Sequence, residues 1–141
     1  MTAEELFEYV EGRMDAGAGE VVIPISGRSM WPFLNPGADR VRLRRCVAAR
    51  RGDIVLARAY SPEGIFLHRV EAVEAGCVRL KGDNNLRQRE LCRPCDVVAV
   101  AVAAISRGKE RSLVSPLRRR VLPALWRLVL PLKSIVAKSL R

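Results

Sequence analysis

Apolar positions change their spacing along the chain, and the change separates an N-terminal helix from a long β-prone region. A helical spacing predicts an amphipathic helix over residues 3 to 14. The Thr2-Ala3-Glu4-Glu5 segment has the form of a capping box at its start. The Ala16-Gly17-Ala18-Gly19 segment ends it as a flexible link. The apolar positions that carry the helical spacing are Leu6, Phe7, Val10 and Met14.

From Val21 to about Ser106 the pattern becomes one of short β-prone runs separated by Gly, Pro and Asn. Strands this short and closely spaced favour hairpins and meanders, so we expect a mostly β fold, a small antiparallel β-barrel or folded sheet. The predicted strands are Val21 to Ile25, Arg40 to Leu43, Asp53 to Ala59, Gly64 to Val73, Cys77 to Lys81 and Val97 to Ile105.

The C-terminal part alternates basic clusters with apolar residues after a polar link over 107–115. The chain therefore divides into an N-terminal helix and link (1–20), a β domain (21–106) and a basic amphipathic helical tail (107–141). One domain with a single core is what 141 residues allow.

Charge is concentrated in this tail. Residues 109–141 contain nine Lys or Arg and one Glu, a net charge of +8, whereas residues 1–108 carry only +2. Trp126 and the flanking cations are typical of a helix that lies on an anionic membrane surface through residues 116–141. A helix docked on the domain or on a partner protein is the alternative. Nucleic acid is a weaker prediction, because the tail has aliphatic side chains where a strand-binding surface has stacking aromatic ones.

The remaining composition limits compartment and cofactors. Met1 to Glu20 is acidic and lacks the apolar run of a secretion signal, so we expect a cytoplasmic protein, peripheral on the inner face of the membrane. Cys92-Arg-Pro-Cys95 has redox or half-zinc spacing, but no second pair completes a site. We expect reduced thiols, no metal and no cofactor; the other two cysteines are Cys46 and Cys77.

Candidate chemistry centres on Ser29 and on His68, the only histidine of the chain. A serine is a poor nucleophile until a base takes its proton, and one imidazole gives one such base. Taken separately, Ser29 is typical of a turn and a lone strand histidine is usually structural.

A hairpin supplies the third group of this predicted site. If Ala75-Gly76 is a two-residue turn, Glu74 faces Cys77 and His68 lies across from Asp83. Directly opposed side chains share a face, with Cβ atoms about 5 Å apart. The Asp83 carboxylate would then orient the imidazole. Asp83 alone, in Gly82-Asp83-Asn84-Asn85, is equally typical of an Asx turn.

Several short motifs occur together and in order. They are Gly27-x-Ser29-Met30-x-Pro32, Gly52-Asp53-Ile54-Val55, His68-Arg69-Val70, Lys81-Gly82-Asp83-Asn84-Asn85 and a Val-rich strand from Val97. In this order they resemble the type I signal peptidases and their relatives, the self-cleaving repressors, over roughly residues 21–105.

The resemblance implies a mostly antiparallel β body that binds an extended peptide by strand addition and cuts beside small residues. It implies Ser29 as nucleophile and His68 as base, as in the His-base branch, with Asp83 as the acidic residue. It places Gly27, Met30, Pro32 and Arg69 at the substrate. The predicted activity is that of a serine endopeptidase.

Two other functions remain open. Ala16-Gly17 and Ala18-Gly19 are small-residue bonds upstream of the β domain, so the protein could cleave itself as the repressors do. Gly27 stands where the family often has an oxyanion-binding serine, and Arg89 where it often has a second aspartate. These two residues favour a non-catalytic peptide-binding module of the same fold.

Overall fold

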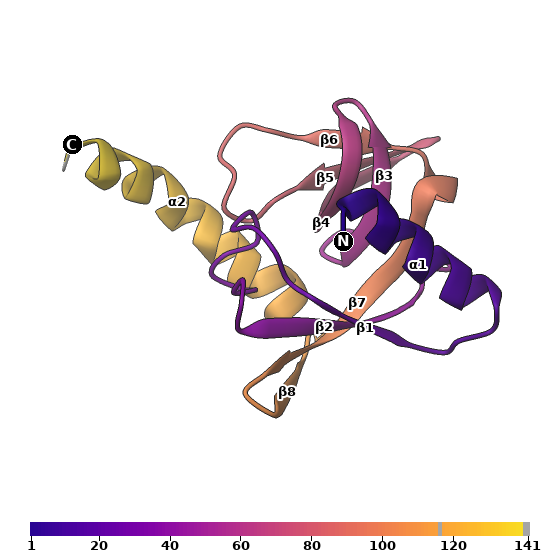
Figure 1. Ribbon diagram of the computed structural model, residues 1–141. Helices are drawn as coiled ribbons and strands as arrows, with labels where there is room; N and C mark the ends of the chain where they lie inside the picture. The colour runs from indigo at the N-terminus through magenta and orange to yellow at the C-terminus, as the bar shows by residue number, and fades with distance from the viewer. Residues whose placement is uncertain (116, 140–141) are drawn as a thin grey trace.

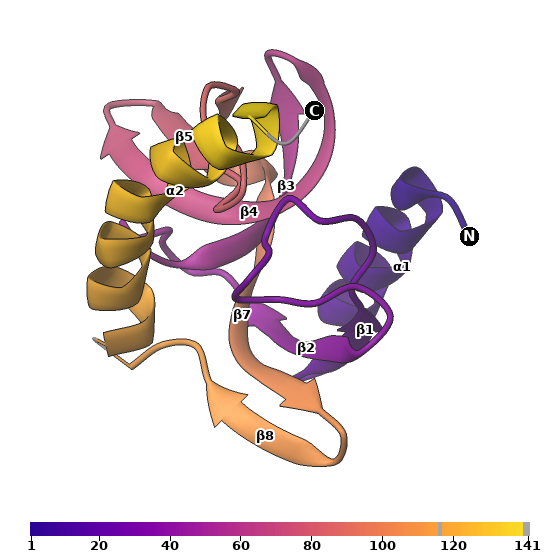
Figure 2. The same ribbon diagram turned by 90° about the vertical axis from the view of Figure 1, so that its left-hand side faces the viewer.

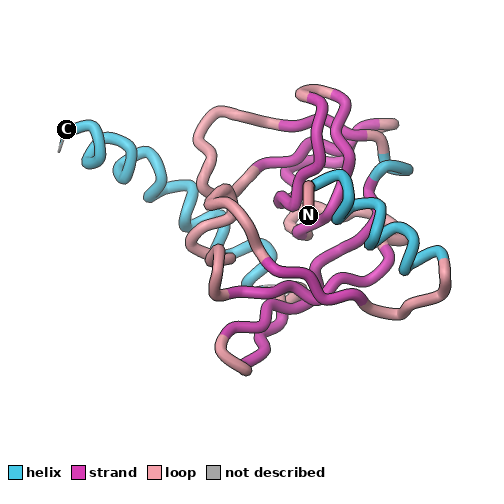
Figure 3. The backbone as a smooth tube through the Cα atoms, viewed as in Figure 1, coloured by secondary structure: helices cyan, strands magenta, loops and turns pink. Residues whose placement is uncertain are grey.

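The computed structural model describes residues 1–115 and 117–139; for residues 117–118 and 132–139 it describes the backbone only. Pro116, Leu140 and Arg141 of the predicted tail lie outside the described residues. Eight antiparallel strands form one open sheet with helices at the two ends of the chain (Figures 1 and 3). The expected mostly β fold is confirmed.

The N-terminal helix α1 covers Ala3–Asp15, as the spacing predicts. Thr2 and Glu5 form both hydrogen bonds of the capping box. The helix packs on the sheet because its apolar stripe is buried: Phe7, Val10 and Met14.

The strands follow the predicted order, with two additions. They are β1 (Val21–Pro24), β2 (Asp39–Arg45), β3 (Ile54–Tyr60), β4 (Glu63–Glu74), β5 (Cys77–Lys81), β6 (Glu90–Cys92), β7 (Val97–Ser106) and β8 (Lys109–Ser112). Strand β6 was not predicted, and β8 lies in the segment expected to be a polar link. A short 3-10 turn, Pro94–Asp96, joins β6 to β7.

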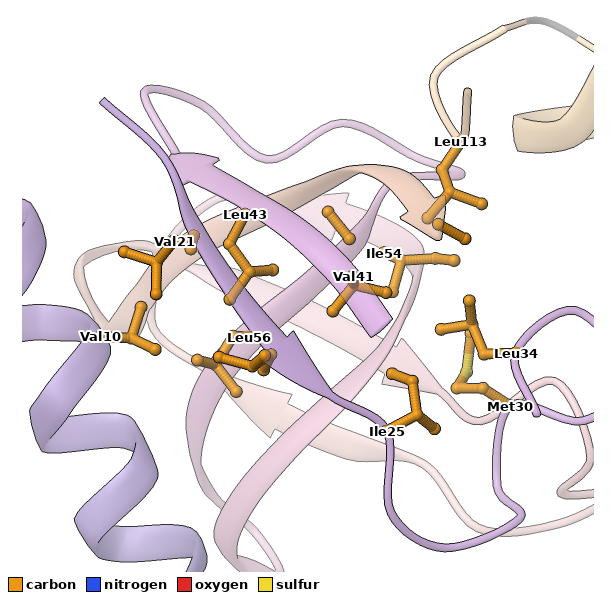
Figure 4. Close-up of a cluster of buried hydrophobic side chains, with 14 of the residues drawn as sticks. Val10, Val21, Ile25, Met30, Leu34, Val41, Leu43, Ile54, Leu56 and Leu113 are labelled. Carbon is orange, nitrogen blue, oxygen red and sulfur yellow. The ribbon is translucent and has the colours of Figure 1, made fainter. Parts of the chain in front are cut away.

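The sheet is folded so that apolar clusters cover both faces of β3. The strand order is β1-β2-β7-β3-β4-β5-β6, with β8 added to β7. Residues of β3 alternate between two apolar clusters: Leu56 packs with α1, β1 and β2, whereas Val55 packs with β4, β5 and β6. The Ser61–Leu91 bridge brings β6 back beside the end of β3. Figure 4 shows the larger cluster.

A basic helical segment comes after β8. A π-helical turn, Leu117–Val121, leads into α2, Leu122–Ser139, which contains Pro131. Its first turns lie along the domain beside β4 and β5, and its C-terminal part projects away from the sheet (Figures 1 and 2). Among the described residues, no helix is long and apolar enough to cross a membrane.

Candidate active site

Ser29 lies in the loop between β1 and β2, and buried neighbours fix its position. The chain turns at Gly27, where φ is +74°, a conformation that glycine adopts without a steric cost. Met30 and Leu34 then insert into the larger apolar cluster (Figure 4). Because both side chains are 3% exposed or less, the loop cannot move without exposing the core.

The loop after β5 holds Ser29 from the other side. The backbone N–H of Asn84 donates to the Ser29 carbonyl over 2.8 Å, and the Asn84 side-chain amide donates to the Arg28 carbonyl over 3.1 Å. Gly82 packs directly on Ser29, because a Cβ at this glycine would lie 2.9 Å from the Ser29 carbonyl oxygen. The Lys81–Asn85 motif therefore positions the serine.

His68 approaches Ser29 from β4, where it pairs with Val55 of β3. Its Nε2 lies 2.8 Å from Ser29 Oγ, and the ring is 4% exposed. A ring tilted against it, that of Phe66, lies 5.2 Å away between centroids. The predicted Ser29–His68 pair is thus present at hydrogen-bonding distance.

Glu90, the first residue of β6, is the carboxylate behind the imidazole. Its Oε1 forms a short hydrogen bond with His68 Nδ1, and its Oε2 accepts from the Gln88 side chain over 2.9 Å. Glu90 is fully buried. A neutral imidazole protonated at Nδ1 donates to Glu90 and accepts the Ser29 hydroxyl proton at Nε2, which is the arrangement an activated serine requires.

The expectation that Asp83 orients His68 is wrong. The Ala75-Gly76 turn and the Glu74–Cys77 pair form as predicted, but a bulge between Val70 and Ala72 shifts the register by one residue. Arg69 then faces Lys81 instead of Gly82. A one-residue shift moves a side chain to the other face of a strand.

Asp83 instead binds the side chain next to the histidine. Its two carboxylate oxygens accept from Arg69 Nε and a terminal guanidinium nitrogen, each over 2.8 Å, and both side chains are nearly buried. Arg69 also donates to the Gly52 carbonyl over 2.8 Å. Arg69, expected at the substrate, is therefore part of a buried ion pair and does not line the groove at Ser29.

A groove of about 300 Å³ contains Ser29 and His68. Gly27 and Met30, both expected at the substrate, line it, whereas Pro32 does not. Its other walls are mainly apolar and come from β1, β3, β4 and the first two turns of α1: Ala3, Leu6, Ile23, Pro24, Ile25, Leu56, Ile65, Phe66 and Leu67. Such a groove can hold an extended, weakly polar peptide segment.

The N-terminal part of α2 is docked on the loops beside the site. Trp126 Nε1 donates to the Asp83 carbonyl over 2.7 Å, and its ring meets that of Trp31 edge-on at 5.8 Å between centroids. Trp126, which the membrane interpretation places at a bilayer interface, thus contacts the protein itself. On the same helix Pro123 and Leu130 are also buried.

The two thiols of the Cys92-x-x-Cys95 motif have different environments. Cys92 is buried, its Sγ faces the Val78 carbonyl oxygen at 3.6 Å, and burial raises the pKa of its thiol to about 11. Cys95 is exposed, and all four cysteines are free of disulfides. The described residues include no group of three or more His, Cys, Asp or Glu side chains that could hold a metal ion.

Comparison of the sequence with protein-family models and with curated proteins gives no match. The assignment of a function therefore depends on the geometry of Ser29, His68 and Glu90.

Sequence reasoning missed Glu90 although it examined the neighbouring Arg89. The signal was an acidic residue between polar Gln88-Arg89 and apolar Leu91-Cys92. A lone Glu at the start of an apolar run is buried only where a partner is in place to bind it.

Proposed function

We propose that this protein is a serine endopeptidase resembling the type I signal peptidases, and that it cuts a peptide or protein beside small residues. The 2.8 Å contact of Ser29 Oγ with His68 Nε2, with Glu90 behind the ring, is the observation that supports it most. The resemblance in the order of five motifs supports the choice of peptide substrates.

Each group has one task in this proposal. His68 takes the proton of Ser29 Oγ as the oxygen attacks the scissile carbonyl, and the Glu90 carboxylate stabilises the imidazolium that forms. His68 then returns the proton to the leaving amine, which gives an acyl-enzyme at Ser29. Water activated by the same imidazole hydrolyses this ester.

Backbone amides would stabilise the oxyanion. Gly27 has no hydroxyl to offer. Among the described residues, the Ser29 N–H donates no hydrogen bond, which leaves it available to the tetrahedral intermediate. Removal of one oxyanion donor from a serine peptidase costs about 100- to 1,000-fold in rate, so we expect a slower enzyme than one with a serine at this position.

Strand β1 is suited to bind the substrate backbone. It lies at one end of the strand order, and Ile23, Pro24 and Ile25 line the groove that leads to Ser29. A peptide added to this edge would place alternate side chains against the apolar walls.

The full chain, its Ser29→Ala and His68→Ala variants and a Ser112→Ala control test the proposal. Ser112 is exposed on β8. Cleavage of a random peptide library followed by mass spectrometry reports activity and specificity together. We expect the two site variants to lose turnover by about 100- to 10,000-fold and the control to keep it. Labelling by a serine-directed phosphonate probe should follow the same order. Equal turnover in the parent and Ser29→Ala would refute the proposal.

Two further measurements on the parent and Ser29→Ala separate the two alternatives. If the protein is a peptide-binding module, the parent and Ser29→Ala will bind peptides equally well, and neither will release a product. A self-cleaving protein would acquire a new N-terminus at Gly17 or Gly19 on ageing at alkaline pH. In the structure the Ala16 and Gly17 amides are hydrogen-bonded into the end of α1. Leu6, which lines the groove, is about 15 Å along the helix axis from Ala16. This placement favours cleavage of another chain.

We also propose that α2 binds an anionic membrane surface. Its outer face exposes large apolar side chains at helical spacing, with Arg120 and Arg127 exposed on the same segment. The exposed apolar residues are Val121, Leu125, Leu128 and Val129. A Leu125→Ser/Leu128→Ser double variant should bind vesicles of mixed phosphatidylcholine and phosphatidylglycerol more weakly than the parent. Unchanged binding would exclude this face.

A further inference from the structure

A second cavity, of about 330 Å³, lies between the start of α2 and strands β4 and β5. Figure 2 shows α2 passing in front of these strands. No residue that lines this cavity also lines the groove of Ser29 and His68. Its volume is within the range of about 300 to 1,000 Å³ that is usual for small-molecule sites.

Cations outnumber carboxylates on the cavity wall, and the carboxylates are already engaged. Asp83 is bound by Arg69, and Glu71 is bound by Arg79 and Arg89. Four lining cations form no ion pair within the described part of the chain: Arg51, Lys81, Arg120 and Arg127.

Lys81 is the buried member of this group. It is 7% exposed, and no described residue forms an ion pair or hydrogen bond with its ammonium group. Burial lowers the pKa of Lys81, with Arg89 and Arg127 acting in the same direction against Asp83 and Glu71. The Lys81 side chain is largely buried and forms no ion pair among the described residues, so an anion bound in the cavity would offset the cost of its desolvation.

Arg119 contributes a donor that is both buried and unsatisfied. Its guanidinium lies 3.6 Å from the Asp53 carboxylate, but its Nε is buried and has no hydrogen-bond partner among the described residues. The chain reaches this position because Gly52 has no side chain: a Cβ there would lie 2.6 Å from the Arg119 carbonyl oxygen.

Apolar side chains form the rest of the wall. Val70, Pro123, Ala124 and Trp126 line the cavity beside the cations. The cavity wall therefore combines planar guanidinium groups and one ammonium with apolar side chains. Several converging cations of both kinds match the multiple oxygens and charge of a phosphoryl group better than a single carboxylate.

We propose that this cavity binds a phosphate group that carries an apolar substituent, held by Lys81, Arg119, Arg120 and Arg127. The phosphate can come from a soluble phosphate ester or from the headgroup of an anionic phospholipid. Because Trp126 lines the cavity and donates to the Asp83 carbonyl, the bound group lies against the loop that positions Ser29.

Titration of the full chain with inorganic pyrophosphate, and with phosphatidylcholine vesicles with and without phosphatidic acid, tests the proposal at fixed ionic strength. The two tryptophans are adjacent, so intrinsic fluorescence reports binding, with calorimetry as a second measurement. The variants are Arg120→Gln/Arg127→Gln and Lys81→Gln. The matched control is Arg13→Gln/Arg40→Gln, which removes the same charge from two exposed positions away from the cavity.

We expect saturable binding that is weakened at least about tenfold in both cavity variants and less than about twofold in the control. Binding of pyrophosphate shows that the cavity takes a soluble phosphoryl group, and binding of phosphatidic acid vesicles alone identifies a lipid headgroup. A Leu125→Ser/Leu128→Ser variant that keeps pyrophosphate binding separates the cavity from the exposed face of α2. Absence of saturable binding to either probe, or equal weakening in the control, would overturn the proposal.

Discussion

His68 and Arg69 are neighbours on β4, yet they belong to two different sites, one mainly apolar and the other basic. His68 lines the apolar groove with Ser29, and Arg69 lines the basic cavity under α2. Both side chains are nearly buried, and His68 binds Glu90 whereas Arg69 binds Asp83. Although His68 and Arg69 are adjacent in the sequence, each is paired with a different carboxylate.

The difference lies in what remains unsatisfied. In the groove the hydrogen-bond chain from Glu90 through His68 ends at the Ser29 hydroxyl, so the reactive oxygen is the group left for a ligand. In the cavity the two carboxylates are already bound by arginines, and cations without an ion pair to a described residue remain. A buried site that is complete except for one nucleophile is suited to chemistry, whereas one with surplus buried charge is suited to binding an ion.

Exchange of each carboxylate for its amide gives the largest expected contrast. Glu90→Gln removes the charge that stabilises the imidazolium, so we expect peptide turnover to fall by about 100- to 10,000-fold. Asp83→Asn leaves the histidine pair intact, so turnover per folded molecule should change little. Its effect should appear as a loss of about 3 to 5 kcal/mol in unfolding free energy, because the buried Arg69 guanidinium loses the carboxylate to which it donates two hydrogen bonds.

Cleavage rates measured below the unfolding temperature of each variant, together with urea unfolding, separate the two effects. The reverse result, with turnover lost in Asp83→Asn and kept in Glu90→Gln, would assign the carboxylates the other way.

A smaller effect is expected at Gly82, which lies between two residues of the cavity wall, Lys81 and Asp83, and packs on Ser29. A Cβ there would lie 2.8 Å from Asn85 Nδ2, 2.9 Å from the Ser29 carbonyl oxygen and 3.1 Å from Ser29 Cβ, so Gly82→Ala must displace the serine loop. A shift of about 1 Å between reacting groups costs about 100-fold in rate. Gly12→Ala is the control, because that helical glycine has open space around its Cβ position. Circular dichroism should show both variants folded; equal peptide turnover in the two would show that Gly82 does not position Ser29.

The sequence predicts the elements of this molecule better than it predicts how charged groups pair. Alternation and turn residues locate most strands, and the capping box locates α1, because both depend on neighbours in the chain. Strand β6 was missed because three residues, Glu90–Cys92, are too few for an alternating pattern. Strand β8 is polar and mostly exposed, so its sequence is typical of a loop.

The site illustrates the same limit. The Ser29–His68 pair follows from residue type, since the chain has one histidine to offer. The carboxylate does not, because a single bulge near Glu71 decides whether Asp83 or another residue reaches the ring. Bulges depend on packing against distant strands, and no local pattern in Val70-Glu71-Ala72 announces one. The cavity was missed for a related reason: its cations come from four separate parts of the chain.

The protonation of Lys81 gives the most subtle test of the contrast between the sites. Burial holds the pKa of Lys81 in the folded protein below its unfolded value of about 10.4. Below the folded pKa both states are protonated, and the folded state bears the cost of desolvating the ammonium. As the pH rises through the folded pKa toward the unfolded one, only the unfolded chain keeps the proton, and that cost is relieved.

The unfolding free energy of the parent should therefore increase with pH relative to that of Lys81→Met, over the interval that ends near the unfolded pKa. Urea unfolding of both proteins at neutral pH and at several alkaline values measures the difference, in which the other titrating groups cancel. Lys109→Met serves as the control for the loss of one lysine, because Lys109 is exposed on β8. A difference that stays constant or declines with pH would mean that the cavity already neutralises its lysine. In that case the surplus charge that distinguishes it from the groove would not exist.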